Sequence, residues 1–251
     1  MNIRTTSALL ALTMVGGMNV AAQEEGFKPS FLLGTDVSTA YIFRGATLHD
    51  KPVAQPYLYA DPIEGLTVGA WGNILLDDGS AGDAVDVNEV DIYAEYDLPV
   101  GEDFPLGISL AYTEYTYPNT TLGEGTVEDP TVAWPSDREV GLLLSMPWCP
   151  LGSTLKAFYG VDGGIDKSLY AEYGIGHSFE GVAEGVTPSL GATVGYADID
   201  GGESGFTAAT VTAGVAVGVA TFKVMYIAEL DDDVLAVDKD VVGTISLSST
   251  F

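Results

Sequence analysis

The chain has 251 residues and a formal net charge of −27, from 36 acidic and 9 basic residues. This excess of acid excludes a nucleic-acid-binding function, because the phosphate backbone would be repelled. The mean hydropathy is nevertheless positive, as expected when the charges are confined to loops between apolar segments. The single cysteine, Cys149, excludes an internal disulfide.

The first 22 residues have the features of a secretory signal peptide. Arg4 lies in a short basic start, an apolar run extends from Ala8 to Val15, and Val20-Ala21-Ala22 forms a small-residue cleavage site. We therefore expect cleavage after Ala22 and a mature chain of one domain, residues 23–251. No later stretch resembles a membrane helix of about 20 apolar residues, so any membrane span must be made of strands.

The mature chain repeats segments of about ten alternating residues, each followed by a turn or polar loop, which is the pattern of a β-barrel. The count is even, as expected when both termini of a bacterial barrel lie on the periplasmic side. The twelve predicted strands are Phe31–Gly45, Val53–Asp61, Leu66–Leu76, Val87–Leu98, Leu106–Tyr117, Arg138–Met146, Thr154–Val161, Ser168–Phe179, Pro188–Ala197, Thr207–Val217, Thr221–Leu230 and Val241–Phe251.

The connections alternate in length with strand parity. Those after even-numbered strands are short and rich in turn-forming residues, such as Pro62–Gly65 and Gly218–Ala220. Those after odd-numbered strands are mostly longer and acidic, such as Pro118–Asp137 and Asp231–Asp240. Short periplasmic turns that alternate with longer outer loops are typical of a bacterial outer-membrane barrel.

Each predicted strand has one apolar and one polar face. In the fourth strand, Ile92 and its alternate neighbours are apolar, whereas Glu89, Asp91, Glu95 and Asp97 share the opposite face. A soluble sandwich would show the same alternation with the faces reversed. The signal peptide and the tyrosines expected at membrane interfaces favour a transmembrane, antiparallel, up-and-down barrel. Those tyrosines are Tyr41, Tyr96, Tyr112 and Tyr196.

The last predicted strand, Val241–Phe251, ends on an aromatic residue. This ending resembles the carboxy-terminal signature of bacterial outer-membrane proteins, although Ser249 stands where those proteins usually have an apolar or aromatic residue. The resemblance implies a location in the bacterial outer membrane, contact with membrane lipid, and recognition of this strand by the barrel-assembly machinery.

A second resemblance begins at Val37–Gly45 and continues in Lys51-Pro52-Val53-Ala54-Gln55. These segments are similar to the opening motif of the TorF family of porin-like proteins, and further similar pieces include Val68–Asn73 and Leu190–Tyr196. Ala40 replaces the aspartate usual in that family. The resemblance implies an outer-membrane barrel with a role in transport.

The inward faces predict a lumen lined by charges and by Trp71. Charged groups in a pore set its ion preference, and the acidic face of the fourth strand favours cations. We therefore expect a passive channel for small polar solutes that prefers cations. The alternative is a lumen filled by paired charges, in a non-conducting structural or adhesion barrel. Both remain open because twelve strands lie between the roughly eight of a filled barrel and the sixteen to eighteen of an open channel. The predicted pore-lining residues are Asp36, Arg44, Trp71, Glu89, Asp91, Glu95, Lys156, Glu172, Lys223 and Glu229.

Enzymatic function and a resident cofactor are not expected. His177 and Ser178 are adjacent and would point to opposite faces of a strand, so they cannot form a catalytic pair. Asp231, Asp232 and Asp233 predict weak divalent-cation binding or solvated negative charge, since they do not follow the spacing of a calcium loop. The aspartates of residues 77–86 allow the same two interpretations.

Overall fold

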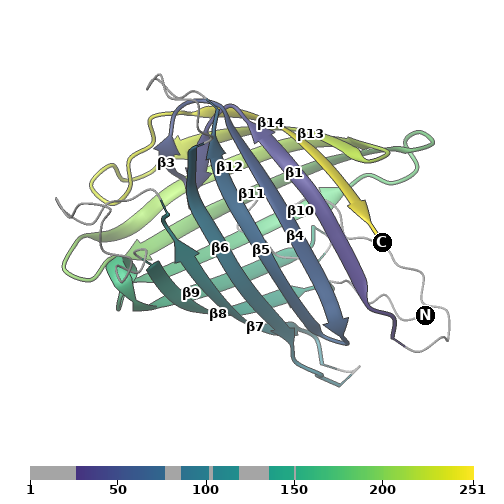
Figure 1. Cartoon of the computed structure of the whole chain (residues 1–251), viewed down its shortest axis with the longest axis horizontal. Helices are drawn as coiled ribbons and strands as arrows, with labels where there is room; N and C mark the ends of the chain where they lie inside the picture. Colours follow the sequence, from purple (N-terminus) through teal and green to yellow (C-terminus); the bar gives the residue numbers. More distant parts are fainter. Residues whose placement is uncertain (1–26, 77–85, 102–103, 119–135, 150) are drawn as a thin grey trace.

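Twelve antiparallel strands form a closed barrel (Figure 1). The structure is a computed structural model, and it describes residues 27–76, 86–101, 104–118, 136–149 and 151–251. Around the barrel, β1 is followed by β14, and the order then decreases along the chain to β4, which pairs with β1. The barrel strands are β1 (Ser30–Ser38), β4 (Val53–Ile63), β5 (Leu66–Leu75), β6 (Asp86–Asp97), β7 (Gly107–Thr116), β8 (Ser136–Met146), β9 (Ser153–Asp162), β10 (Leu169–Ser178), β11 (Val186–Asp198), β12 (Ser204–Val217), β13 (Ala220–Glu229) and β14 (Val241–Thr250).

The first and last strands close the barrel. In the register of β1 and β14, Leu32 lies opposite Thr250 and Ser38 lies opposite Thr244. Next to the pair Leu32–Thr250, Phe31 and Phe251 exchange backbone hydrogen bonds of 3.1 and 2.9 Å. Closure leaves the described barrel wall without an unpaired strand edge. The predicted fold class of about twelve antiparallel strands is therefore confirmed.

The connections divide between the two ends of the barrel. We call the end where β1 begins and β14 ends the terminal end, and the opposite end the loop end (Figure 1). The connections after β4, β6, β8, β10 and β12 lie at the terminal end, and the shortest are the two-residue turns 64–65 and 218–219. These are the second, fourth, sixth, eighth and tenth of the predicted strands, so the predicted division of the connections between two ends is confirmed. Much of two loop-end connections, residues 77–85 and 119–135, lies outside the described residues.

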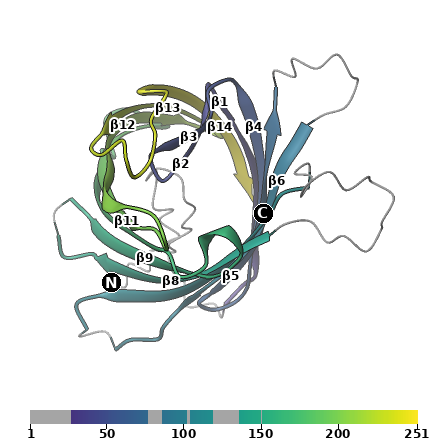
Figure 2. The ribbon, with the colours of Figure 1, turned by 90° about the vertical axis from the view of Figure 1, so that its left-hand side faces the viewer.

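The prediction of one continuous strand from Phe31 to Gly45 is wrong. β1 ends at Ser38, and the chain then turns inward into a short hairpin of β2 (Tyr41–Phe43) and β3 (Ala46–His49). Figure 2 shows this hairpin inside the ring of barrel strands. We call residues 39–50 the inner hairpin. The alternation of apolar residues continues from β1 into β2, so the sequence pattern did not reveal the turn.

The buried apolar core lies inside the barrel, where the inner hairpin packs against the wall. Alternate residues of β2 face opposite sides, as expected for a strand. Tyr41 and Phe43 pack with Val53 and Trp71 on one side. On the other side, Ala40 and Ile42 pack with a cluster of wall residues, namely Ala208, Ile227 and Val242. Tyr41 is therefore buried in the lumen and does not lie at a membrane interface as predicted.

The outside of the barrel is apolar around its whole circumference. Each of the twelve strands presents at least one exposed large apolar or aromatic side chain, and Ile92 of β6 is 60% exposed. Within the described residues, Gly163–Ile165 is one short 3-10 turn, and no helix there is long and apolar enough to cross a membrane. One such outward residue from each strand, in chain order, is Leu33, Leu58, Val68, Ile92, Leu110, Leu142, Leu155, Tyr173, Leu190, Val211, Val224 and Leu247.

Candidate functional site

The tip of the inner hairpin is a two-residue turn made by Arg44 and Gly45. Phe43 pairs with Ala46 across this turn, and φ is 54° at Arg44 and 91° at Gly45. Positive φ at both central residues is the requirement of a type I′ hairpin turn, in which Asn-Gly is the favoured pair. An arginine in this region of φ is strained. We infer that the contacts of its side chain hold it there.

The Arg44 side chain crosses the lumen and pairs with Glu139 of β8. Its Nη2 lies 2.7 Å from both carboxylate oxygens, and the Tyr115 hydroxyl donates to the same carboxylate at 2.7 Å. Glu139 is only 2% exposed. Removing one partner of a buried charge pair is strongly destabilising, because the other charge is left uncompensated. This pair therefore anchors the inner hairpin to the far wall.

Aromatic rings surround the same guanidinium. Its central carbon lies 4.6 Å from the ring centroid of Phe43, 4.9 Å from that of Phe158 and 4.6 Å from that of Tyr170. Cation–π contacts of this kind add to the ion pair, and they are strongest where the cation is desolvated. The rings come from β2, β9 and β10, so Arg44 joins the inner hairpin to several wall strands.

A bulge in β12 shapes the wall beside this turn. Between the pairs Val194–Ala209 and Tyr196–Phe206, β12 has two residues, Thr207 and Ala208, opposite one residue of β11. Both are almost fully buried, and the Thr207 hydroxyl donates to the Arg44 carbonyl at 3.4 Å. A β-bulge redirects side chains locally, and here it brings two small residues against the hairpin tip.

The β13–β14 connection, residues 230–240, covers the inner hairpin at the loop end. The Thr47 amide donates to the Ala236 carbonyl at 3.1 Å, and Lys239 Nζ donates to the Asp50 carbonyl at 3.0 Å. Val234 is buried against Tyr170 and a neighbouring wall alanine. The inner hairpin and this connection therefore pack against each other at the loop end of the lumen.

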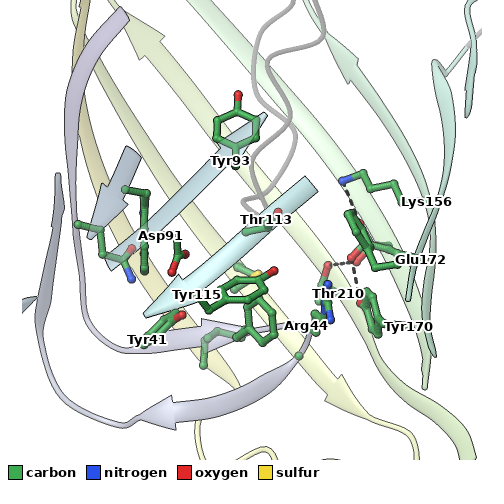
Figure 3. Close-up of a pocket in the computed structure, with 18 of the residues that line it drawn as sticks. Tyr41, Arg44, Asp91, Tyr93, Thr113, Tyr115, Lys156, Tyr170, Glu172 and Thr210 are labelled. Carbon is green, nitrogen blue, oxygen red and sulfur yellow. Dashed lines mark hydrogen bonds and ion pairs between the residues drawn. The ribbon is translucent and has the colours of Figure 1, made fainter. Parts of the chain in front are cut away.

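A cavity of about 180 Å³ remains beside the inner hairpin. One wall is acidic and aromatic, with Asp91 and Tyr93 of β6, whereas Lys156, Glu172 and Tyr170 lie on the other side (Figure 3). Threonines line much of the remaining surface, and they come from β7, β9, β11, β12 and β14. The cavity is therefore lined by apolar and aromatic side chains together with polar and charged ones, and its charges are unevenly distributed.

Each of the three basic side chains among the described residues that line the cavity has a carboxylate partner. Arg44 pairs with Glu139 as described above. Lys156 lies 3.3 Å from Glu172 on the neighbouring strand, and Lys223 lies 3.4 Å from Asp36. Among the described residues, Asp91 Oδ1 and Glu95 Oε1 on the acidic wall have no hydrogen-bond partner.

The predicted pore-lining residues divide into several groups. Six line the cavity from barrel strands, while Arg44 lines it from the inner hairpin and not from the first strand as predicted. Asp36 and Glu89 are buried next to it but do not line it. Glu229 lies exposed at the end of β13, outside the cavity. The six are Trp71, Asp91, Glu95, Lys156, Glu172 and Lys223.

Sequence reasoning missed the partners of the hairpin tip. Glu139 and Tyr115 are inward residues of strands that were predicted, but they were not selected as pore-lining. Their separation from Arg44 by 95 and 71 residues leaves no local signal of contact. The available signal was the Arg44-Gly45 pair, since a glycine in the second position is typical of a two-residue hairpin turn.

The other sequence candidates lie outside the cavity. Asp231, Asp232 and Asp233 bring carboxylate oxygens within 4.8 Å of one another at the loop end. His177 lies exposed near the end of β10, with its ring 4.8 Å from that of Phe179. The aspartates predicted in residues 77–85 lie outside the described residues.

The fold defines the class of this protein, which is a closed antiparallel β-barrel with an apolar exterior and a lumen that holds a hairpin and charged side chains. The chain belongs to the family described as "Bacterial protein of unknown function (Gcw_chp)", which matches residues 25–207. None of the curated proteins compared matches the chain.

Several solved barrels are similar to this chain. An outer membrane channel from Pseudomonas putida F1 is 13% identical over 89% of this chain and 94% of that one, with a TM-score of 0.41. The translocator domain of the autotransporter NalP from Neisseria meningitidis is 11% identical, over 91% and 89%, with a TM-score of 0.39. A loop-deletion mutant of OmpT, an outer membrane protein of Vibrio cholerae, is 10% identical, over 89% and 98%, with a TM-score of 0.38.

Proposed function

We propose that this protein is a bacterial outer-membrane channel for the passive diffusion of small polar solutes, with a preference for cations. The observation that carries the proposal is the exposed apolar belt, to which all twelve strands contribute. Soluble monomers rarely expose apolar patches larger than a few hundred Å², whereas a barrel in lipid requires such a belt. Strand lengths of 9 to 14 residues suit a tilted membrane span.

Exposed aromatic residues support the same location. Near the terminal end, Phe31, Phe179 and Phe222 face outward from β1, from the end of β10 and from β13. Toward the loop end, Phe206 and Tyr226 do so from β12 and β13. Aromatic girdles on both sides of an apolar band are typical of outer-membrane barrels. In this orientation the terminal end is periplasmic and the inner hairpin enters the lumen from outside.

The charge balance of the lumen supports a cation preference. Its basic residues are paired with carboxylates, whereas Asp91 and Glu95 each have a carboxylate oxygen without a hydrogen-bond partner among the described residues. A narrow polar passage with excess negative charge concentrates cations and repels anions. The carried solutes are then small, because the inner hairpin lies inside the barrel and narrows the lumen (Figure 2).

Further parts of the proposal follow from the sequence. Residues 1–22 are a signal peptide that is removed on export, the barrel-assembly machinery recognises β14, and the TorF resemblance gives the narrower family. The protein acts without catalysis or a resident cofactor. Asp231, Asp232 and Asp233 bind divalent cations weakly at the outer surface.

A planar-bilayer recording on the refolded protein tests the channel. We expect discrete conductance steps, and in a KCl gradient a reversal potential that favours K⁺ over Cl⁻. An anion-selective reversal potential would contradict the role of Asp91 and Glu95.

A second candidate function is a non-conducting structural or adhesion barrel with acidic surface loops. The observation that favours it is the filling of the loop end by the inner hairpin and residues 230–240. Electrical silence in the same recording, from protein that is folded and inserted, would support this function and contradict the channel.

A further inference from the structure

Unpartnered polar atoms gather on one wall of the cavity. Within the described residues, five buried side-chain atoms on β4, β5 and β6 have no hydrogen-bond partner. Four of them are oxygens that can accept, and the fifth is the indole nitrogen of Trp71, a donor. All five residues line the cavity. The four oxygens are Tyr59 Oη, Asp91 Oδ1, Tyr93 Oη and Glu95 Oε1.

This concentration is unusual, since buried polar groups in proteins are almost always hydrogen-bonded. Tyr59 and Glu95 are each only 3% exposed. Leaving a buried carboxylate oxygen without a partner is costly, and a cation that donates hydrogen bonds removes this cost. The wall therefore has the chemistry of a site for a ligand that is positively charged and donates hydrogen bonds.

The wall also leaves room for a ligand, because small residues lie beside the large ones. In the strand register, Tyr93 lies between Gly69 and Thr113, and Glu95 lies between Thr67 and Ala111. A β-carbon at Gly69 would overlap the rings of both Tyr59 and Tyr93. Those rings can therefore lie close against the wall. The cavity of about 180 Å³ exceeds the roughly 150 Å³ that accommodates a benzene-sized molecule.

The spacing of the two carboxylates excludes joint chelation of one metal ion. Asp91 and Glu95 are four residues apart on one face of β6, which corresponds to about 13 Å along a strand. Calcium ligands must all lie about 2.3–2.6 Å from the same ion. A ligand that satisfies both carboxylates must instead be extended and carry a positive charge at each end.

The side chains between the two carboxylates are aromatic. Tyr93 lies between them on β6, and its ring packs edge-on against Tyr59 with centroids 5.1 Å apart. Aromatic rings attract ammonium groups and present apolar surface to an alkyl chain. If each ammonium group lies about 2.8 Å from its carboxylate, on the side that faces the other carboxylate, the two nitrogens are about 7–8 Å apart, which a nearly extended hexamethylenediamine provides.

We propose that this wall binds a linear organic diammonium ion. One ammonium group pairs with Asp91, the other pairs with Glu95, and the alkyl chain lies along Tyr93 and Tyr59. The inference rests on the proposed channel function, because the ligand reaches the wall through the lumen. It identifies extended organic cations as a class of solute that the lumen holds.

Calorimetric titration of the detergent-solubilised, folded protein with hexamethylenediamine tests this site. We expect saturable binding at one site. Aminohexanol, which has similar length but only one ammonium group, should bind at least about tenfold more weakly, because a hydrogen bond to a charged group contributes about 1.5–3 kcal/mol. This comparison uses the unaltered protein and does not depend on whether a variant folds. Equal affinity for the two compounds, or no binding at millimolar concentration, would overturn the proposal.

Variants locate the site. Asp91→Asn and Glu95→Gln should each raise the Kd for hexamethylenediamine about tenfold or more. Glu114→Gln is the matched control, because Glu114 lies on the neighbouring strand β7 outside the cavity and its carboxylate accepts from Arg138 at 3.1 and 3.2 Å. Unchanged affinity in both test variants, or an equal loss in the control, would refute the assignment.

Calorimetry does not require conduction, so the two proposals can fail separately. Binding without channel activity would contradict only the proposed channel. Conduction without diamine binding would contradict only this site.

Discussion

The Arg44 side chain makes the charged contacts that hold the inner hairpin in the lumen, beside its apolar packing and backbone hydrogen bonds, so Arg44→Asn should weaken this hold. Asparagine is favoured at positive φ in a type I′ turn, so this substitution preserves the hairpin while it removes the guanidinium. The loss includes both short contacts with Glu139 and three cation–π contacts. Breaking a buried charge pair costs about 3–5 kcal/mol. At 1.4 kcal/mol for each factor of ten, the population with a displaced hairpin rises by about two to three and a half orders of magnitude.

Single-channel recording measures this release. The variant should show more frequent transitions to a larger conductance, because the hairpin is displaced from the lumen for a larger fraction of the time. Arg138→Asn is the matched control. It removes an arginine whose ion pairs with Glu114 and Asp162, at 3.1 and 2.8 Å, lie at the loop end and are partly exposed, and exposed pairs contribute about 0–1 kcal/mol. Identical conductance in the Arg44 variant and the unaltered protein would refute this account of the hairpin.

Three further predictions concern the wall, the exterior and the terminal-end turns. Combining Asp91→Asn with Glu95→Gln should shift the reversal potential in a KCl gradient toward zero, because the preference for K⁺ over Cl⁻ is reduced. An unchanged reversal potential would mean that other residues set the ion preference. Leu142→Arg on the outward face should lower the free energy of membrane folding in urea titrations by about 2–4 kcal/mol, whereas a loss near zero would argue against lipid contact there. The Ser153 hydroxyl donates to the Cys149 sulfur at 3.0 Å and, with a backbone hydrogen bond, lowers the pKa of that thiol. Ser153→Ala should raise this pKa, reduce the thiolate fraction near pH 8 and slow alkylation by iodoacetamide, and an unchanged rate would contradict the role of the hydroxyl.

The sequence predicted the barrel well because its determinants are local. Alternation within β6 assigns Ile92 outward and Glu95 inward, and the structure places Ile92 exposed and Glu95 buried. Turn-forming residues and strand parity together define the two ends of the barrel. These signals depend on neighbouring residues, so one sequence contains them in full.

The contents of the lumen could not be predicted in the same way. Alternation continues through Ser38 into Tyr41, so the pattern does not distinguish a longer strand from a strand that folds back. What separates them is the pairing of Arg44 with Glu139, which depends on the curvature of the whole barrel. Glu229 was also misplaced. The alternation of its strand predicted that it faces inward, but the strand ends at this residue and its side chain is exposed.

The central claim is that the apolar sides of the strands face lipid and the polar sides face an enclosed lumen. Spin labels at Ile92→Cys and, separately, at Thr210→Cys, in a Cys149→Ser background reconstituted in lipid vesicles, test it most directly. We predict that the label at position 92 relaxes strongly with oxygen, which dissolves in the bilayer, and weakly with a water-soluble nickel complex, and that position 210 shows the lower oxygen response. Greater nickel than oxygen accessibility at position 92 would contradict the account.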